Sequence, residues 1–142
     1  MPIGLKRAYD KPSSSDGARI LVDRLWPRGV SKQAARFDAW LRDLAPSDQL
    51  RRWFHARPAM WQLFRKKYLE ELAEPAAAKA LGDLYDLARK RKKLTLVFAS
   101  KNQEYNNAVV LKELLDGMRK PPHSSGPEKA AARPMRARRS VR

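Results

Sequence analysis

The residues best suited to chemistry lie in one loop at 23–29, which reads Asp-Arg-Leu-Trp-Pro-Arg-Gly and follows an apolar run. Arg24 and Arg28 each carry a planar guanidinium that fits a phosphate or carboxylate group. The ring of Trp26 offers a flat face for stacking. We therefore expect this loop to bind an anionic ligand, with Asp23 as a candidate catalytic group that accepts a proton. The alternative is structural: Asp23 pairs with one of the two arginines, and Trp26 fills the core.

A second polar segment, at 100–107, follows another apolar run. Ser100 and Lys101 come directly after that run, and Asn106 and Asn107 fall in the first turn of the predicted next helix. Backbone N–H groups at a helix N-terminus attract anions, so we interpret these four residues as further ligand-binding residues. The segment lacks the glycines of a Walker A loop. The alternative is an ordinary capped connection between a strand and a helix.

A third segment, at 44–58, interleaves basic and aromatic side chains, namely Arg51, Arg52, Trp53, Phe54 and Arg57. Such a mixture can bind RNA or single strands through stacking and phosphate contacts. The alternative places the aromatic rings in the core and lets the arginines reach solvent. His55 lies in the same segment and is a second candidate catalytic residue, as a general acid or base.

The composition excludes several kinds of site. The chain has no Cys, which rules out disulfides, a zinc ribbon and a thiol nucleophile. Its two histidines are His55 and His123, so a multi-histidine metal site is excluded, and we expect neither a metal nor a cofactor. No stretch approaches the roughly 18 apolar residues that would cross a bilayer. We therefore expect a soluble, cytoplasmic protein that has no membrane partner.

The net charge is strongly positive. The chain has 31 Lys and Arg residues against 15 Asp and Glu, a net charge of +16. Such a field attracts polyanions, so nucleic acid is an alternative partner, and Arg136, Arg138 and Arg139 near the C-terminus would contact its phosphates. A general drift of the composition towards Arg and Ala explains the same charge without any partner.

Apolar runs predict the strands that position these loops. The runs at 18–22 and 94–99 are continuous, which is typical of strands covered on both faces of a parallel sheet. A weaker strand is expected at 3–8, and 36–41 is ambiguous between strand and helix. Ligands of such sheets bind beyond the carboxyl ends of the strands, where the first two polar segments begin.

Caps, prolines and apolar stripes predict four helices: one at 48–56, one that opens at Pro58, one that opens at Pro75 and one at about 103–117. A basic run at 89–93 ends the third helix, and we interpret it as a solvated helix terminus. The fold class is therefore α/β: a single three-layer domain at 1–119 with a small, mostly parallel sheet flanked by helices. Residues 120–142, rich in Pro, Ser and Arg, are predicted to form a disordered basic tail.

Several ordered motifs resemble the DUF488 family in its YeaO-like branch. They are LVDRLWPRG at 21–29, LAPS followed by LRRWF, FRKKYLEEL at 64–72 and NNAVVLKELL at 106–115. The resemblance covers residues 3–116 and implies a compact α/β domain of unassigned activity. The family signature maps onto Asp23, Arg24, Trp26, Pro27, Arg28, Gly29, Pro46, Ser47, Arg51, Trp53, Phe54 and Asn106. A His commonly precedes this Asn in the family, whereas this chain has Tyr105.

Three functions compete on these observations. The favoured one is an enzyme or binding protein for an anionic small molecule or nucleotide, held by Arg24, Arg28 and Lys101. The second is a nucleic-acid-binding or regulatory module that uses the basic surface and tail. The third is a structural or partner-binding domain. The sequence assigns neither a reaction nor an oligomeric state.

Overall fold

The computed structural model describes residues 3–118. Four strands form one sheet in the order β1-β4-β2-β3, and every neighbouring pair is parallel. The strands are β1 (Ile3–Arg7), β2 (Ala18–Leu21), β3 (Ala39–Trp40) and β4 (Leu94–Phe98). This confirms the predicted α/β class. The predicted tail at 120–142, which includes Arg136, Arg138 and Arg139, lies outside the described residues.

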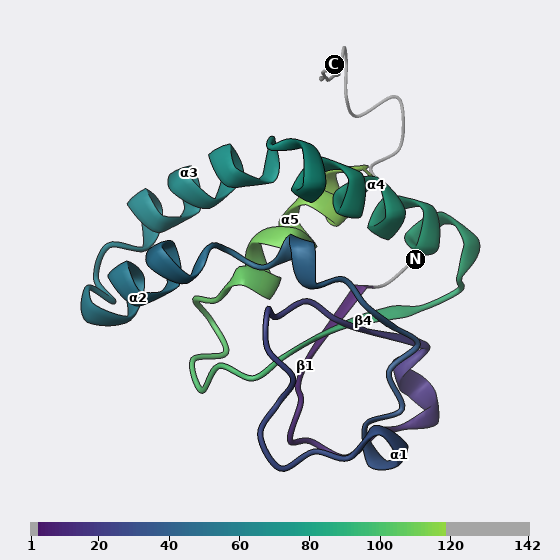
Figure 1. Ribbon diagram of the computed structural model, residues 1–142. Coiled ribbons are helices and arrows are strands. Elements are labelled where there is room, and N and C mark those ends of the chain that lie inside the picture. The colour runs from purple at the N-terminus through teal and green to yellow at the C-terminus, as the bar shows by residue number, and fades with distance from the viewer. Residues whose placement is uncertain (1–2, 119–142) are drawn as a thin grey trace.

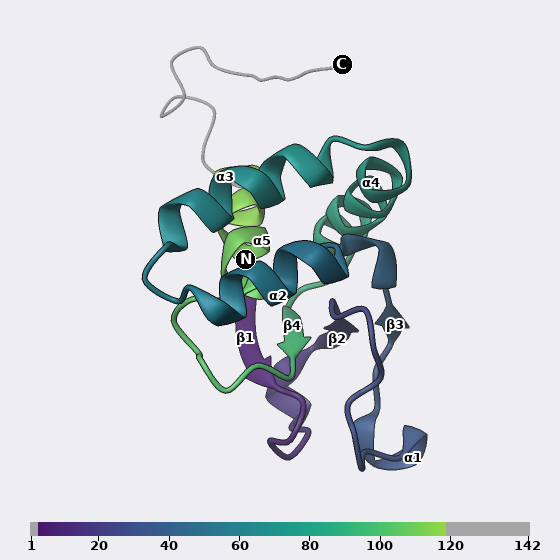
Figure 2. The same cartoon turned by 60° about the vertical axis from the view of Figure 1, so that its left-hand side comes forward.

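Helices cover the two faces of the sheet unequally. The helices α2 (Asp48–Ala56), α3 (Trp61–Leu72), α4 (Pro75–Lys90) and α5 (Asn107–Met118) lie on one face, and only the short α1 (Lys32–Ala35) lies on the other (Figures 1 and 2). The 3₁₀ turns η1 (Ser14–Asp16) and η2 (Arg42–Leu44) complete the chain. One outer layer is therefore built mainly of irregular chain.

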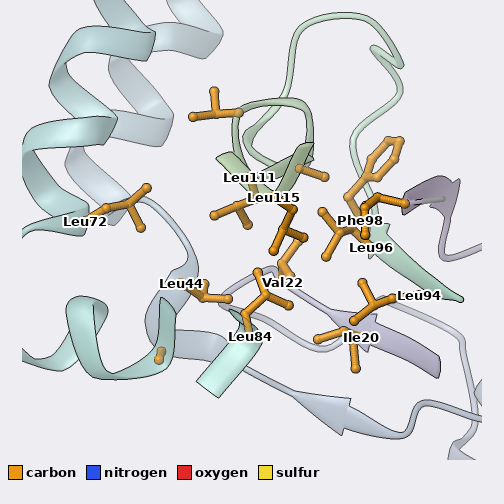
Figure 3. Packing of buried hydrophobic residues seen from close by; sticks show 14 of the residues in the cluster. Ile20, Val22, Leu44, Leu72, Leu84, Leu94, Leu96, Phe98, Leu111 and Leu115 are labelled. Atoms are coloured by element: carbon orange, nitrogen blue, oxygen red, sulfur yellow. The ribbon is translucent and has the colours of Figure 1, made fainter. Parts of the chain in front are cut away.

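The main core lies between the sheet and the larger helical layer. Because strand side chains alternate between faces, Ile20 and Val22 point into this core, while Leu21 points to the opposite face. Figure 3 shows the strand residues packing against Leu111 and Leu115 of α5 and Leu84 of α4. These side chains are fully buried, and each such burial stabilises the fold by about 1.5–3 kcal/mol.

The opposite face of the sheet carries a smaller aromatic cluster. Leu21 and Val97 pack there beneath Trp26, Phe37 and Trp40. The Trp26 ring meets Phe37 at 5.2 Å and Trp40 at 5.5 Å between ring centroids, both edge to face. The segment between β2 and β3 thus covers this face with rings rather than with a long helix.

Three helix starts were predicted from caps and prolines, and two are confirmed. Ser47 caps α2 by accepting a hydrogen bond from the Leu50 N–H, and Pro75 is the first residue of α4. The prediction at Pro58 is wrong: Arg57 and Met60 close successive turns there, and α3 begins only at Trp61.

Local interactions set the start of α5 and the start of β3. The predicted helix at 103–117 begins late, at Asn107, because the Asn102 side chain accepts the N–H groups of Glu104 and Tyr105 and holds a turn. The ambiguous segment at 36–41 contains the short strand β3. Arg36 precedes this strand and ends α1 in the left-handed conformation, at φ 52°.

Candidate functional site

The loops after β2 and β4 leave neighbouring strands towards opposite faces of the sheet. The chain after β2 forms the aromatic cluster on the face that carries α1, whereas the chain after β4 leads to α5 on the main helical face (Figure 2). Such a reversal between adjacent parallel strands is the place where open α/β sheets bind ligands. The first two polar segments of the sequence meet at this point.

Asp23 joins the two loops directly. Its Oδ2 accepts a hydrogen bond of 2.8 Å from the Ala99 N–H, which follows β4. The Nδ2 of Asn107 donates to the Val22 carbonyl at 3.0 Å and lies 3.4 Å from Asp23 Oδ1. The carboxylate is therefore tied to the end of β4 and to the first residue of α5.

The environment of Asp23 shifts its pKa upward. Burial raises the pKa of this carboxyl group above its ordinary value, although the Ala99 N–H, the Asn107 amide and the positive charge of Arg51 oppose the rise. A carboxyl group with a raised pKa at a strand end is typical of functional sites.

Buried polar groups extend inward from this position. The Tyr68 hydroxyl donates to the carbonyl of Leu44, and both residues are fully buried. Burial and the negative charges of Asp23 and Glu71 hold the pKa of Tyr68 well above its ordinary value. Tyr68 is therefore a neutral hydrogen-bond donor at every physiological pH.

Glu71 fastens the start of α2 to α3. Its two carboxylate oxygens accept hydrogen bonds from the Ser47 N–H at 2.8 Å and from the Ser47 Oγ at 2.6 Å. Ser47 Oγ in turn accepts the Leu50 N–H at 3.1 Å. This arrangement fixes the end of α2 that carries Arg51, whose positive charge lowers the pKa of Asp23.

Three arginines lie around this helix start. The Arg24 guanidinium is exposed and donates a 3.4 Å bond to the Ala45 carbonyl. Arg51 pairs with Asp48 at 2.5 Å and Arg52 pairs with Asp48 at 2.9 Å. The hydrogen bond from Arg51 and the positive charges of all three arginines lower the pKa of Asp48. The structure thus brings Arg24 and Arg51 to the same helix end.

The loop at 23–29 divides its residues between two environments. Trp26 belongs to the aromatic cluster, where its Nε1 donates to the Val30 carbonyl at 2.5 Å, so its ring is engaged in packing. Arg28 is exposed and forms no ion pair or hydrogen bond with any residue of 3–118. Asp23 makes no ion pair with either arginine of the loop within the described chain, so this part of the structural alternative is not observed. The other part, Trp26 packed in a core cluster, is observed.

The second polar segment has a frame and an exposed tip. Arg7 frames it by donating to the carbonyls of Ala99 and Ser100, each at 3.0 Å. Ser100 and Lys101 are exposed. Asn106 caps α5, because its Oδ1 accepts the Val109 N–H at 3.1 Å.

The third segment is largely structural. Phe54 stacks on Phe64 with ring centroids 4.4 Å apart. Two cations lie over the Trp53 ring. The Arg57 guanidinium is 5.6 Å and the Lys67 ammonium 5.4 Å from the ring centroid. His55 is exposed at the end of α2, and its side chain has no hydrogen bond to Asp23 or to any other group within residues 3–118. Asp23 and His55 are therefore not brought together.

Tyr68 and Glu71 were not predicted from the sequence as part of a site. Ser47 was expected only as a helix cap, and its contact with Glu71 was not predicted. Tyr68 lies on the apolar stripe of α3, together with Phe64 and Leu72. The hydroxyl of a tyrosine on a buried stripe needs a hydrogen-bond partner, so the sequence already indicated a buried polar contact at this position. Nothing in the sequence pairs Ser47 with Glu71, since the two lie 24 residues apart.

Residues 3–118 contain neither a cluster of metal-binding side chains nor a membrane-spanning helix. No group of three or more His, Asp or Glu side chains lies close enough together to hold a metal ion. No helix in that range is both long and apolar enough to cross a membrane.

Comparison with known proteins places the chain in a family. A family model described as the inactive DUF488-N3 subclade matches residues 2–131. The uncharacterised protein YeaO of Escherichia coli (strain K12) is 43% identical over 116 residues, which cover 81% of this chain and 97% of YeaO. The uncharacterised proteins Mb3100c of Mycobacterium bovis and Rv3073c of Mycobacterium tuberculosis are each 38% identical over 115 residues, which cover 81% of this chain and 94% of theirs. No solved structure matches the chain. This chain is therefore a member of the DUF488 family, in its YeaO-like branch.

Proposed function

We propose that the protein binds a small anionic molecule, such as a phosphorylated metabolite or a nucleotide, at the carboxyl edge of its sheet. The observation that carries this proposal is the Asp23 carboxylate, which ties the loop after β2 to the loop after β4 where the two connections diverge. Ligands of open α/β sheets bind at this place because backbone and side-chain polar groups from several strands converge there.

Exposed polar groups around Asp23 supply the ligand chemistry. Arg24 reaches out from one loop, and Ser100 and Lys101 form the exposed start of the other. Arg51 adds positive charge from α2. A guanidinium, an ammonium and a hydroxyl suit a phosphate or carboxylate group. In this proposal Asp23 positions the two loops, and Arg24 and Lys101 contact the anion.

We propose binding without turnover rather than catalysis. Both oxygens of Asp23 already face N–H donors, and His55 does not meet Asp23. The matching family model is described as an inactive subclade, which agrees with a ligand that is bound and released unchanged.

A thermal-shift panel on the full chain tests the proposal, with inorganic phosphate, ribose 5-phosphate, AMP and ATP as probes. A ligand present at 100 times its Kd stabilises the native state by about 2.7 kcal/mol. At about 4 °C per kcal/mol for a domain of this size, the melting temperature rises by roughly 10 °C. Calorimetric titration then gives the stoichiometry, and chromatography of the ligand afterwards shows whether it is unchanged.

The informative variants are Arg24→Gln and Lys101→Gln, and Lys66→Gln is the matched control. Lys66 is exposed on α3 and makes no ion pair within residues 3–118, so its loss changes the net charge equally. We expect the first two variants to lose most of the shift and the control to keep it. If no probe shifts the wild type, or if the control loses as much as Arg24→Gln, the proposed site is wrong.

A further inference from the structure

The basic run that follows α4 lines an open pocket at the opposite edge of the sheet. The pocket has a volume of about 530 Å³ and is lined by Ser14, Ser15, Gly17, Ala18, Lys90, Arg91, Lys92 and Lys93. The turn from α4 into β4 lies across the sheet from the loop that contains Lys101 (Figure 1). This pocket is therefore separate from the candidate site at Asp23.

Backbone contacts hold the two sides of the pocket together. The Ala18 N–H donates to the Lys93 carbonyl at 3.0 Å, and the buried Thr95 hydroxyl donates to the Asp16 carbonyl at 2.7 Å. Gly17 has φ +68°, and a Cβ there would lie 2.3 Å from the Lys93 carbonyl oxygen. The 3₁₀ turn η1 thus sits directly against the start of β4, and only glycine permits this approach.

The cations of the pocket lack acidic partners. Lys90, Arg91, Lys92 and Lys93 form no ion pair or side-chain hydrogen bond with any residue of 3–118. Asp16, which lies between the lining residues Ser15 and Gly17, is buried and is paired with Lys6 at 3.1 Å and Arg19 at 2.7 Å. Asp86, four residues before Lys90, is paired with Arg89. No acidic side chain lines the pocket, so its positive charge is not neutralised from within.

Stabilisation of the helix end explains only part of this run. Cations in the last turn of a helix complement its carbonyl end, and Arg89 and Lys90 fill that role in α4. Arg91 is already the C-cap in an extended conformation, and Lys92 and Lys93 lie beyond the helix. Adjacent like charges repel one another, so three further cations at this point cost stability unless an anion offsets them.

We propose that this pocket is a second anion site, for closely spaced phosphate groups, with Lys90, Lys92 and Lys93 as phosphate ligands. Ser14 and Ser15 of η1 also line the pocket, and their hydroxyl groups can donate hydrogen bonds to a phosphate. Its open form suits a chain of phosphates better than a single enclosed ion. The phosphates belong either to a polynucleotide backbone or to the phosphate chain of a small molecule.

Binding of a fluorescent 20-base-pair DNA duplex and of tripolyphosphate, each by the full chain across a salt titration, tests this site. The test variant is Lys90→Gln/Lys92→Gln. The control is Lys32→Gln/Lys66→Gln, because these two exposed lysines lie elsewhere and their loss gives the same net charge. Each lost phosphate contact lowers the slope of log K against log salt by about 0.9 for duplex DNA.

We expect the test pair to lower the slope for its phosphate ligand by about 2 and the affinity at least about tenfold, with less than threefold loss in the control. If this loss occurs with the duplex, the source is a polynucleotide. If it occurs with tripolyphosphate alone, the source is a small molecule. Equal losses in both pairs, or no binding of either probe, would overturn the proposal. Melting curves of both variants verify that each is folded.

Discussion

Replacing Asn107 with alanine removes the side chain that joins the start of α5 to the end of β2. The Nδ2 group of Asn107 donates to the carbonyl of Val22, a residue with no solvent exposure, and approaches Asp23 Oδ1. Alanine leaves the Val22 carbonyl without this donor. An unpaired buried acceptor costs about 1–3 kcal/mol, and the lost contact with Asp23 adds about 1 kcal/mol.

The expected loss for Asn107→Ala is therefore about 3 kcal/mol, out of a total stability of the order of 5–15 kcal/mol. At about 4 °C per kcal/mol the melting temperature falls by roughly 12 °C. The neighbouring Asn106→Ala is the matched control, because it removes an identical amide side chain from the preceding residue. Asn106 caps α5, and the loss of such a cap costs about 1 kcal/mol, or roughly 4 °C.

Thermal and urea unfolding of the two variants measure this difference directly. A carboxyl NMR titration adds a second readout, because the Asn107 amide lowers the pKa of Asp23. In Asn107→Ala that pKa rises further, whereas in Asn106→Ala it stays unchanged. If the two variants unfold together, or if the Asp23 titration does not move, then Asn107 does not tie the loop to the helix.

Two further predictions concern the strained turn and the buried carboxylate. Gly17→Ala places a Cβ 2.3 Å from the Lys93 carbonyl oxygen at a positive φ, so we expect a loss of about 3–5 kcal/mol in urea unfolding. Gly82→Ala meets open space within α4 and is expected to stabilise slightly, by up to about 1 kcal/mol; equal urea midpoints for the two would contradict this reasoning. Burial raises the folded pKa of Asp23 above its unfolded value near 3.9, so its contribution is fully present below that pH and is lost as pH rises through the folded pKa. Asp23→Asn does not titrate, so its stability relative to the wild type should rise as the pH increases above about 4, and parallel curves would refute the assignment.

Local residue patterns determined most of the elements and the position of the first loop. The continuous apolar runs became β2 and β4, because a strand covered on both faces needs apolar side chains on both. Ser47 and Pro75 marked two helix starts through their own backbone chemistry. Asp23 was expected after a buried strand, and it lies there.

Only the tertiary structure decided what those residues contact. The strand order places β4 between β1 and β2, and this order brings the Ala99 N–H to Asp23 across 76 residues of sequence. In the folded chain Trp26 packs in the aromatic cluster, and Ser47 hydrogen-bonds to Glu71. The basic run at the end of α4 lines a pocket together with residues 14–18. Sequence periodicity reports which face of an element is apolar, but it carries no information on which distant element will cover that face. The contacts of Asp23 and the position of the basic run therefore follow from the order of the strands.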